Sequence, residues 1–147
     1  MNRKTRLPLL LAWAFALPAM AQAELTLVNP NLAEKDVLQA LPNVDDEIAQ
    51  AIIDGRPYSS AVDLDTALAG VMDDEQREAL YTRLFQPIAL NTASEAEFLL
   101  IPGVSKKMAH EFVEYRPYKS MEQFRREIGK YVDEDEVARL ESYVTLD

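Results

Sequence analysis

The chain repeats itself at a spacing of sixty residues, and this period constrains its fold more than any other feature. Shifting the sequence by sixty places aligns similar residues without a gap, among them Asn31 with Asn91, Leu41-Pro42 with Ile101-Pro102, Arg56-Pro57-Tyr58 with Arg116-Pro117-Tyr118, Asp73 with Asp133, and Leu80 with Leu140. Chance matches would not stay in register over this length. The sequence therefore predicts one unit built twice, over residues 24–87 and 88–147, joined at 86–90.

Each unit is predicted to contain four short helices, which makes the fold class all-α. In the second unit the expected N-caps are Ser94, Ser105, Ser120 and Asp133, because serine and aspartate side chains accept hydrogen bonds from a helix start. Glu97 completes a capping box with Ser94. Pro102 and Gly103 end the first of these helices. Short extended segments are expected over 25–28, 88–90 and 143–146.

The helix after Ser105 is predicted to be amphipathic. Its apolar face would carry Met108, Ala109, Phe112 and Val113, and its polar face Lys106, Lys107, Glu111 and Glu114. This 3.6-residue period is typical of a helix that covers a core with one face.

The N-terminal segment 1–23 has the features of a secretory signal peptide. Arg3, Lys4 and Arg6 precede an apolar run over 7–16, and Ala21-Gln22-Ala23 is a small-residue cleavage site. The run is shorter than the roughly 20 apolar residues that span a bilayer. We therefore expect cleavage after Ala23 and export to a periplasmic or extracellular location, in preference to an uncleaved membrane anchor.

The expected mature chain is strongly acidic. The signal segment holds three of the 15 basic residues and none of the 25 acidic ones, which leaves 12 − 25 = −13. Residues 24–88 contribute 4 − 13 = −9, and residues 89–147 contribute 8 − 12 = −4. Such a surface repels nucleic acid and favours a basic partner. Since the chain has no cysteine, its stability has to come from packing.

The second unit carries a recognisable motif. Asn91-Thr92-Ala93, then Ile101-Pro102-Gly103-Val104, then Lys106-Lys107-Met108-Ala109 resembles the helix-hairpin-helix motif. The following segment 116–124 and the terminal Tyr143-Val144-Thr145 make this unit look like the competence protein ComEA domain, with the first unit as a degenerate copy. The fold is also similar to that of the extrinsic U-type subunit of photosystem II, which binds protein. The resemblance fits the fold but leaves two ligand classes, DNA and protein.

The resemblance implies a phosphate site in the second hairpin. Its candidate residues are Gly103, Ser105, Lys106, Lys107 and Lys119. It also implies a monovalent cation held by the carbonyls of Leu99, Ile101 and Val104. Ser105 stands where the family has a second glycine, so we expect a strained positive φ there, costing about 1 kcal/mol or more.

In the first unit Asn43 and Asp45 replace both of the motif's glycines. The acidic run 45–47 then occupies the position of the phosphate. Asparagine tolerates a left-handed conformation, so the hairpin fold is expected to persist there without an anion site.

Two interpretations of the lysines stay open at this point. With Arg125 or Arg126, the lysines at 106, 107 and 119 would supply about three to five phosphate contacts. Alternatively they form a solvated helix start that keeps the hairpin soluble. Arg56-Pro57-Tyr58 and its copy at 116–118 are either partner contacts or connectors, and their repetition on differently charged units favours connectors.

Catalytic residues are scarce in this sequence. His110 is the only histidine, and Glu114 lies one helical turn away, which predicts a surface ion pair rather than a metal site needing three or four ligands. The acidic runs lack the spacing of a calcium loop. We therefore predict a non-catalytic binding module that leans toward protein–protein interaction or scaffolding. The alternatives are ComEA-like, non-sequence-specific DNA binding in DNA uptake and a purely structural spacer.

Overall fold

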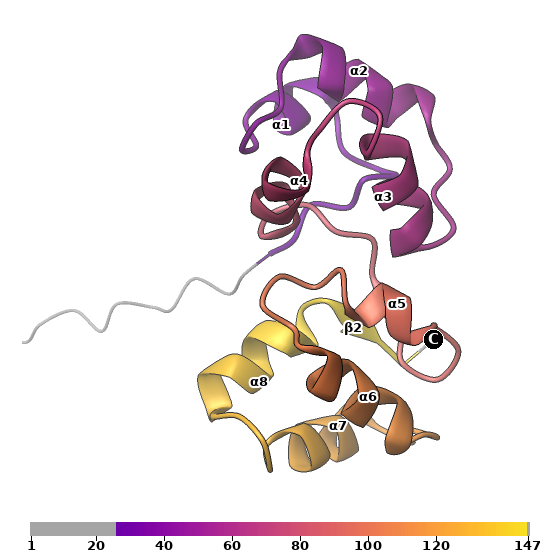
Figure 1. Ribbon diagram of the computed structural model, residues 1–147, viewed down its shortest axis with the longest axis vertical. Helices are drawn as coiled ribbons and strands as arrows, with labels where there is room; N and C mark the ends of the chain where they lie inside the picture. The colour runs from indigo at the N-terminus through magenta and orange to yellow at the C-terminus, as the bar shows by residue number, and fades with distance from the viewer. Residues whose placement is uncertain (1–25, 147) are drawn as a thin grey trace, which may run out of the picture.

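The computed structural model describes residues 26–146, so the predicted signal peptide and its cleavage site after Ala23 lie outside the described residues. The described chain is mostly helical, as predicted, and forms two lobes stacked along the long axis (Figure 1). The first lobe contains α1 (Lys35–Gln39), α2 (Asp46–Asp54), α3 (Ala61–Leu68) and α4 (Asp74–Tyr81). The second contains β1 (Ile88–Ala89), α5 (Glu95–Phe98), α6 (Lys106–Glu114), α7 (Met121–Ile128), α8 (Glu134–Glu141) and β2 (Val144–Thr145).

The sixty-residue period reappears in the element bounds. Three helices of the second lobe, α6, α7 and α8, begin and end sixty residues after α2, α3 and α4. Because equivalent segments fold into equivalent helices, we call residues 26–87 the first repeat and 88–146 the second repeat.

The predicted N-caps account for the helix starts. The Ser105 hydroxyl accepts a hydrogen bond from the Met108 N–H at 3.2 Å, and Asp133 accepts one from the Glu136 N–H at 2.9 Å. The Glu97 carboxylate accepts the Ser94 N–H at 2.8 Å. These contacts satisfy helix-start donors that have no partner within the helix, which confirms the caps.

Each repeat closes on itself through a short parallel pairing. In the second repeat Ile88 pairs with Val144, and in the first repeat the equivalent residues, Val28 and Leu84, form an isolated bridge. The backbone bonds are equivalent too: Val28 N–H to the Arg83 carbonyl at 2.8 Å, and Ile88 N–H to the Tyr143 carbonyl at 2.9 Å. Within the predicted extended segments at 88–90 and 143–146, the structure confirms strand pairing for Ile88–Ala89 and Val144–Thr145.

Equivalent positions build the two cores from different side chains. The second repeat packs Phe98, Phe112 and Phe124 with ring centroids 5.0 and 5.7 Å apart, and all three are fully buried. Sixty residues earlier the first repeat buries Leu38, Ile52 and Leu64. At these three equivalent positions the same backbone plan therefore packs aromatic rings in one repeat and aliphatic side chains in the other.

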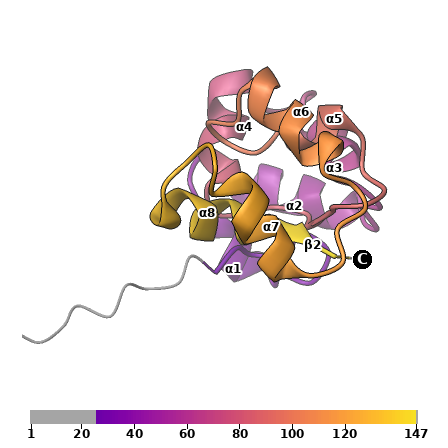
Figure 2. The same cartoon turned by 90° about the horizontal axis from the view of Figure 1, so that it is seen from below.

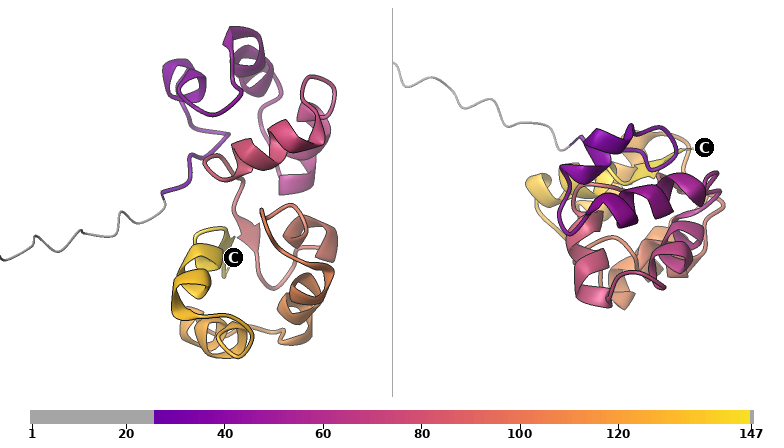
Figure 3. Two further views of the ribbon diagram at one scale, coloured as in Figure 1. Left: turned by 60° about the vertical axis from the view of Figure 1, so that its left-hand side comes forward. Right: turned by 90° about the horizontal axis from the view of Figure 1, so that it is seen from above.

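The two repeats pack directly against each other at the junction. The Tyr143 hydroxyl of the second repeat donates to the Tyr81 carbonyl of the first at 3.0 Å. Phe85 lies edge-on to both Tyr81 and Tyr143, with centroid distances of 5.6 and 5.0 Å. Helix α3 also contacts α5 across this boundary. Figure 2 views the molecule along its long axis, and the left panel of Figure 3 shows one lobe above the other. One continuous hydrophobic core results.

The repeated Arg-Pro-Tyr segment is a connector. Arg116 donates to the carbonyls of Leu90 and Ala93, and the Tyr118 N–H donates to the Asn91 side chain at 2.7 Å. In the first repeat Arg56 and Tyr58 make the same contacts, to the carbonyls of Pro30 and Ala33 and to Asn31. Both Arg–Pro peptide bonds are cis. The guanidinium thus fastens the segment that precedes the first helix of each repeat.

Candidate functional site

The hairpin between α5 and α6 turns on one left-handed residue. Gly103 has φ 77°, and the equivalent Asn43 of the first repeat has φ 59°, the one positive value among the described non-glycine residues. A Cβ on Gly103 would meet only the Arg139 guanidinium, at 3.8 Å. Backbone conformation, more than space, therefore favours glycine or asparagine here.

The expectation of strain at Ser105 was wrong. Ser105 has φ −80° and ψ 161°, an extended conformation open to any residue, and Asp45 has φ −93° and ψ −172°. Both residues are N-caps, which adopt extended backbone while the side chain accepts from the helix start. The hairpin therefore needs one left-handed residue and tolerates serine or aspartate two places later.

The predicted lysines lie at the start of α6 and in the connector after it. Lys106, Lys107 and Lys119 are exposed. The Lys107 ammonium lies 5.9 Å from the centre of the Tyr131 ring, a cation–π distance. Lys106 and Lys119 have no ion-pair partner within residues 26–146. The hairpin thus brings Gly103, Ser105, Lys106 and Lys107 together, while Lys119 belongs to the connector.

The candidate cation carbonyls belong to the same turn. Among the carbonyls of Leu99, Ile101 and Val104, that of Ile101 accepts the Val104 N–H at 3.0 Å. This bond closes the turn around Pro102 and Gly103. Within residues 26–146 no group of three or more acidic, histidine or cysteine side chains is arranged to hold a metal.

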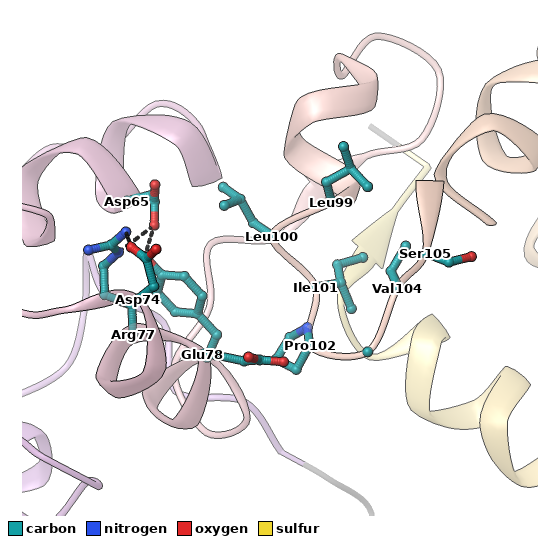
Figure 4. Close-up of a pocket in the computed structure, with 12 residues that line it drawn as sticks. Asp65, Asp74, Arg77, Glu78, Leu99, Leu100, Ile101, Pro102, Val104 and Ser105 are labelled. Carbon is teal, nitrogen blue, oxygen red and sulfur yellow. Dashed lines mark hydrogen bonds and ion pairs between the residues drawn. The ribbon is translucent and has the colours of Figure 1, made fainter. Parts of the chain in front are cut away.

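A cleft separates the second hairpin from the first repeat. It encloses about 530 Å³, and its walls come from α3 and α4 on one side and residues 99–105 on the other. Figure 4 shows Glu78 extending from α4 toward Pro102, while Leu100 and Leu99 lie apart from this pair, on the segment that leads to the turn. A ligand at the turn would therefore meet the acidic first repeat as well.

The ionic groups of the cleft are unevenly balanced. Its lining contains the carboxylates of Asp65, Asp74 and Glu78 against the single guanidinium of Arg77. Arg77 binds Asp65 at 2.9 Å and Asp74 at 2.6 Å, and it also donates to the Met72 carbonyl. The charge of Arg77 is therefore matched. The Glu78 carboxylate forms no hydrogen bond or ion pair with any residue in 26–146. The cleft lining carries a net negative charge.

The buried Tyr81 side chain holds one of the cleft's carboxylates in place. Tyr81 donates to Asp65 at 2.8 Å. Its pKa is raised well above the ordinary value of 10.0, first by burial and then by the neighbouring Asp65 carboxylate. The tyrosine therefore stays a neutral donor that fixes Asp65.

The position of Glu111 was predicted wrongly. The amphipathic pattern placed it on the solvent face of α6, yet it is 8 % exposed. The Tyr131 hydroxyl lies 2.8 Å from the Tyr115 hydroxyl, and the neighbouring Tyr115 hydroxyl and Glu111 carboxylate raise the pKa of Tyr131. The Oε2 atom of Glu111 and the buried Tyr118 hydroxyl have no hydrogen-bond partner within the described chain. Glu111 is therefore buried by the tertiary fold, which helical periodicity does not record.

Leu99 is apolar but exposed. Helix α5 ends at Phe98, and Leu99 is 38 % exposed at the cleft. Sequence reasoning also missed Asp74 and Glu78 as neighbours of the second hairpin. They lie in the other repeat, and no local signal indicates that contact.

The remaining candidate cations are engaged elsewhere. Arg125 forms two hydrogen bonds with Glu141, at 2.7 and 2.5 Å, and Arg126 bonds Glu127 at 2.8 Å. His110 lies 4.0 Å from Glu114 in an exposed pair, as predicted. Of the predicted phosphate-contacting cations, the three lysines are therefore the ones that form no ion pair within residues 26–146.

Comparison with known families agrees with this geometry. The family model described as the helix-hairpin-helix motif matches residues 85–144, which covers the second repeat and its junction. This motif indicates a nucleic-acid-binding or protein-binding module. No curated protein and no solved structure shows significant similarity to the chain. No helix within residues 26–146 has the length and apolar character needed to cross a membrane.

Proposed function

We propose that the protein is an exported, non-catalytic module that binds a protein partner through the hairpin of the second repeat and the acidic surface that faces it. The observation that carries the proposal is the placement of Asp74 and Glu78 on the opposite wall of the hairpin cleft. A phosphate backbone approaching this wall would be repelled. A polypeptide carries backbone acceptors for the hairpin and cationic side chains for the carboxylates.

The rival function is DNA binding of the ComEA type, supported by the matched motif and by three exposed lysines. Counterion release gives a salt slope of about −0.9 per phosphate, hence about −2.7 for three lysines. Such a slope corresponds to only a few phosphate contacts. Residues 24–88 carry a formal charge of −9, which repels a phosphate backbone. Charge therefore favours a protein partner.

A crosslinking experiment separates the two classes of ligand. A benzophenone amino acid would replace Leu99 in cells that produce the protein, and Val62 on α3, equally 38 % exposed, would serve as the matched control. We expect adducts at position 99 that a protease removes and a nuclease leaves intact, and few adducts at position 62. Nuclease-sensitive adducts at position 99 would overturn the proposal.

Duplex binding in solution provides the second test. Fluorescence anisotropy of the mature chain with labelled duplex DNA should show no saturation at micromolar protein in physiological salt. The Lys106→Glu/Lys107→Glu variant should behave like the wild type. Micromolar binding that weakens with salt and disappears in this variant, but persists in Lys35→Glu/Arg83→Glu, would establish the DNA function instead.

Export is tested separately. The proposed cleavage predicts that the protein from the periplasmic or extracellular fraction begins at Glu24, which intact-mass measurement would show. A mass that includes residues 1–23 in a cytoplasmic fraction would contradict it.

A further inference from the structure

We propose that the cleft between the repeats is a binding site for an extended basic segment of the partner protein, one in which a lysine or arginine adjoins an aliphatic residue. This inference rests on the proposed protein-binding function and names the chemistry that the cleft would recognise. It depends on surfaces contributed by both repeats.

The apolar part of the cleft comes from the second repeat. Leu99, Leu100 and Pro102 line it, and Leu99 is among the few large apolar side chains exposed within residues 26–146. An isolated exposed leucine is ordinary, but this one borders a concave surface. An aliphatic side chain placed there would remove both surfaces from water.

The charged part of the cleft comes from the first repeat. Asp65 is held by Tyr81 and Arg77, and Arg77 is in turn held by both Asp65 and Asp74. Glu78 alone among the lining carboxylates has no partner in the described chain, and the Asp74 side chain is 98 % exposed. A cation entering the cleft therefore finds Glu78 without breaking an existing ion pair.

The cleft lining combines apolar side chains from the second repeat with carboxylates from the first, and this combination selects a particular kind of side chain. Lysine and arginine have an apolar stem and a charged head, so one residue can lie along apolar surface and reach a carboxylate. Polyphosphate would find no such match, because its charge has the sign of the cleft's. The complementarity thus favours a basic segment over nucleic acid.

The test uses a short probe peptide of sequence GKLKG titrated into isotopically labelled mature protein and followed by NMR. We expect saturable shifts confined to the amides of 99–105 and α4. The charge-reversed peptide GELEG should cause none, and GKGKG should bind more weakly because it lacks the aliphatic contact. Shifts spread over the acidic helix starts near Asp45 and Asp133 would overturn the inference.

Two matched variants locate the interaction. Glu78→Gln should weaken GKLKG by about fivefold, roughly the value of one solvent-bordering charge pair. Glu75→Gln removes the same charge from the same helix outside the cleft lining, and should change affinity less than twofold. Equal effects of the two variants would indicate diffuse attraction to an acidic surface and overturn the site.

The outcomes distinguish this inference from the proposed function. If GKLKG fails to bind and crosslinking at position 99 still yields protein adducts, the basic-segment site is wrong and the protein-binding function stands. If duplex DNA binds at physiological salt and shifts the amides of 99–105, both are wrong.

Discussion

The two repeats share a backbone plan and differ in what they expose at equivalent points. In both, an arginine and an asparagine hold the segment that precedes the first helix. In both, the hairpin turns on one left-handed residue, Asn43 or Gly103. The difference lies at the helix start that follows. In α6 it carries Lys106 and Lys107, and in α2 it carries Asp46 and Glu47, with Asp46 paired to Lys35 at 2.8 Å.

The comparison indicates that the fold and the ligand surface vary independently. Residues that set the turn and the connector recur because both copies need the same backbone geometry. Charges at the helix starts do not take part in that geometry, so they differ between copies. The second hairpin is thus the candidate site, and the first repeat supplies an acidic wall opposite it.

The largest expected effect concerns equivalent residues with different roles, Tyr143 and Arg83. Tyr143 is buried at the junction, whereas Arg83 exposes its side chain. We expect Tyr143→Ala to lower the free energy of unfolding by about 3–5 kcal/mol, as for other large aromatic truncations. Arg83→Ala should change it by less than about 0.5 kcal/mol. Urea denaturation followed by circular dichroism measures both, and equal effects would show that the repeats are not joined through Tyr143.

The connector arginines should matter in both repeats. Arg56→Ala and Arg116→Ala each remove a charged donor to two carbonyls, and a hydrogen bond to a charged group contributes about 1.5–3 kcal/mol. We expect losses of about 2–3 kcal/mol in the free energy of unfolding. Arg116 also lies 5.4 Å from the centre of the Phe98 ring, so its loss should be larger by about 0.5–1 kcal/mol.

Lysine at either connector position provides the control for charge. Arg116→Lys and Arg56→Lys keep the positive charge but cannot contact both carbonyls in the same planar geometry. They should recover less than half of the lost stability in thermal denaturation. Full recovery would show that charge alone, and not the two-carbonyl contact, holds the connector.

The hairpin turn should tolerate exchange between the repeats. Gly103→Ala places a Cβ on a left-handed residue and should cost about 1–2 kcal/mol. Gly103→Asn should cost less, since asparagine occupies the equivalent turn in the first repeat. Thermal unfolding of the two variants checks the order, and an asparagine variant as unstable as the alanine one would contradict it.

The smallest expected effect is an acid sensitivity confined to the second repeat. Hydrogen bonds from Lys130 and Arg126 lower the pKa of Glu127 below its ordinary value of 4.5, while the equivalent residue is Ala67. A lowered folded-state pKa stabilises the protein above about pH 4.5, and the contribution is lost as pH falls through the folded pKa. Glu127→Gln should therefore be less stable than the wild type at pH 7, and the two should converge as the pH falls through the folded-state pKa of Glu127. A gap in urea midpoint that persists in acid would contradict this assignment.

Local signals accounted for much of the structure. Ser105, Ser120 and Asp133 start helices because their side chains accept hydrogen bonds within the next turn. Side chains covered by distant segments were less accessible to such reasoning. Glu111 was placed in solvent because helical spacing records only its own helix, whereas the folded chain buries it and brings Tyr131, twenty residues later, close enough for Glu111 to raise the Tyr131 pKa.

The sequence by itself determined the two-repeat plan, the helical class and the residues of the second hairpin. These depend on interactions within a few residues, or on a period that can be read directly. Only the tertiary structure decided that Glu78 and Asp74 face that hairpin, that Leu99 borders the cleft, and that Tyr143 joins the repeats. Such contacts arise from the angle at which two units pack, and that angle is set by the whole junction rather than by any local pattern.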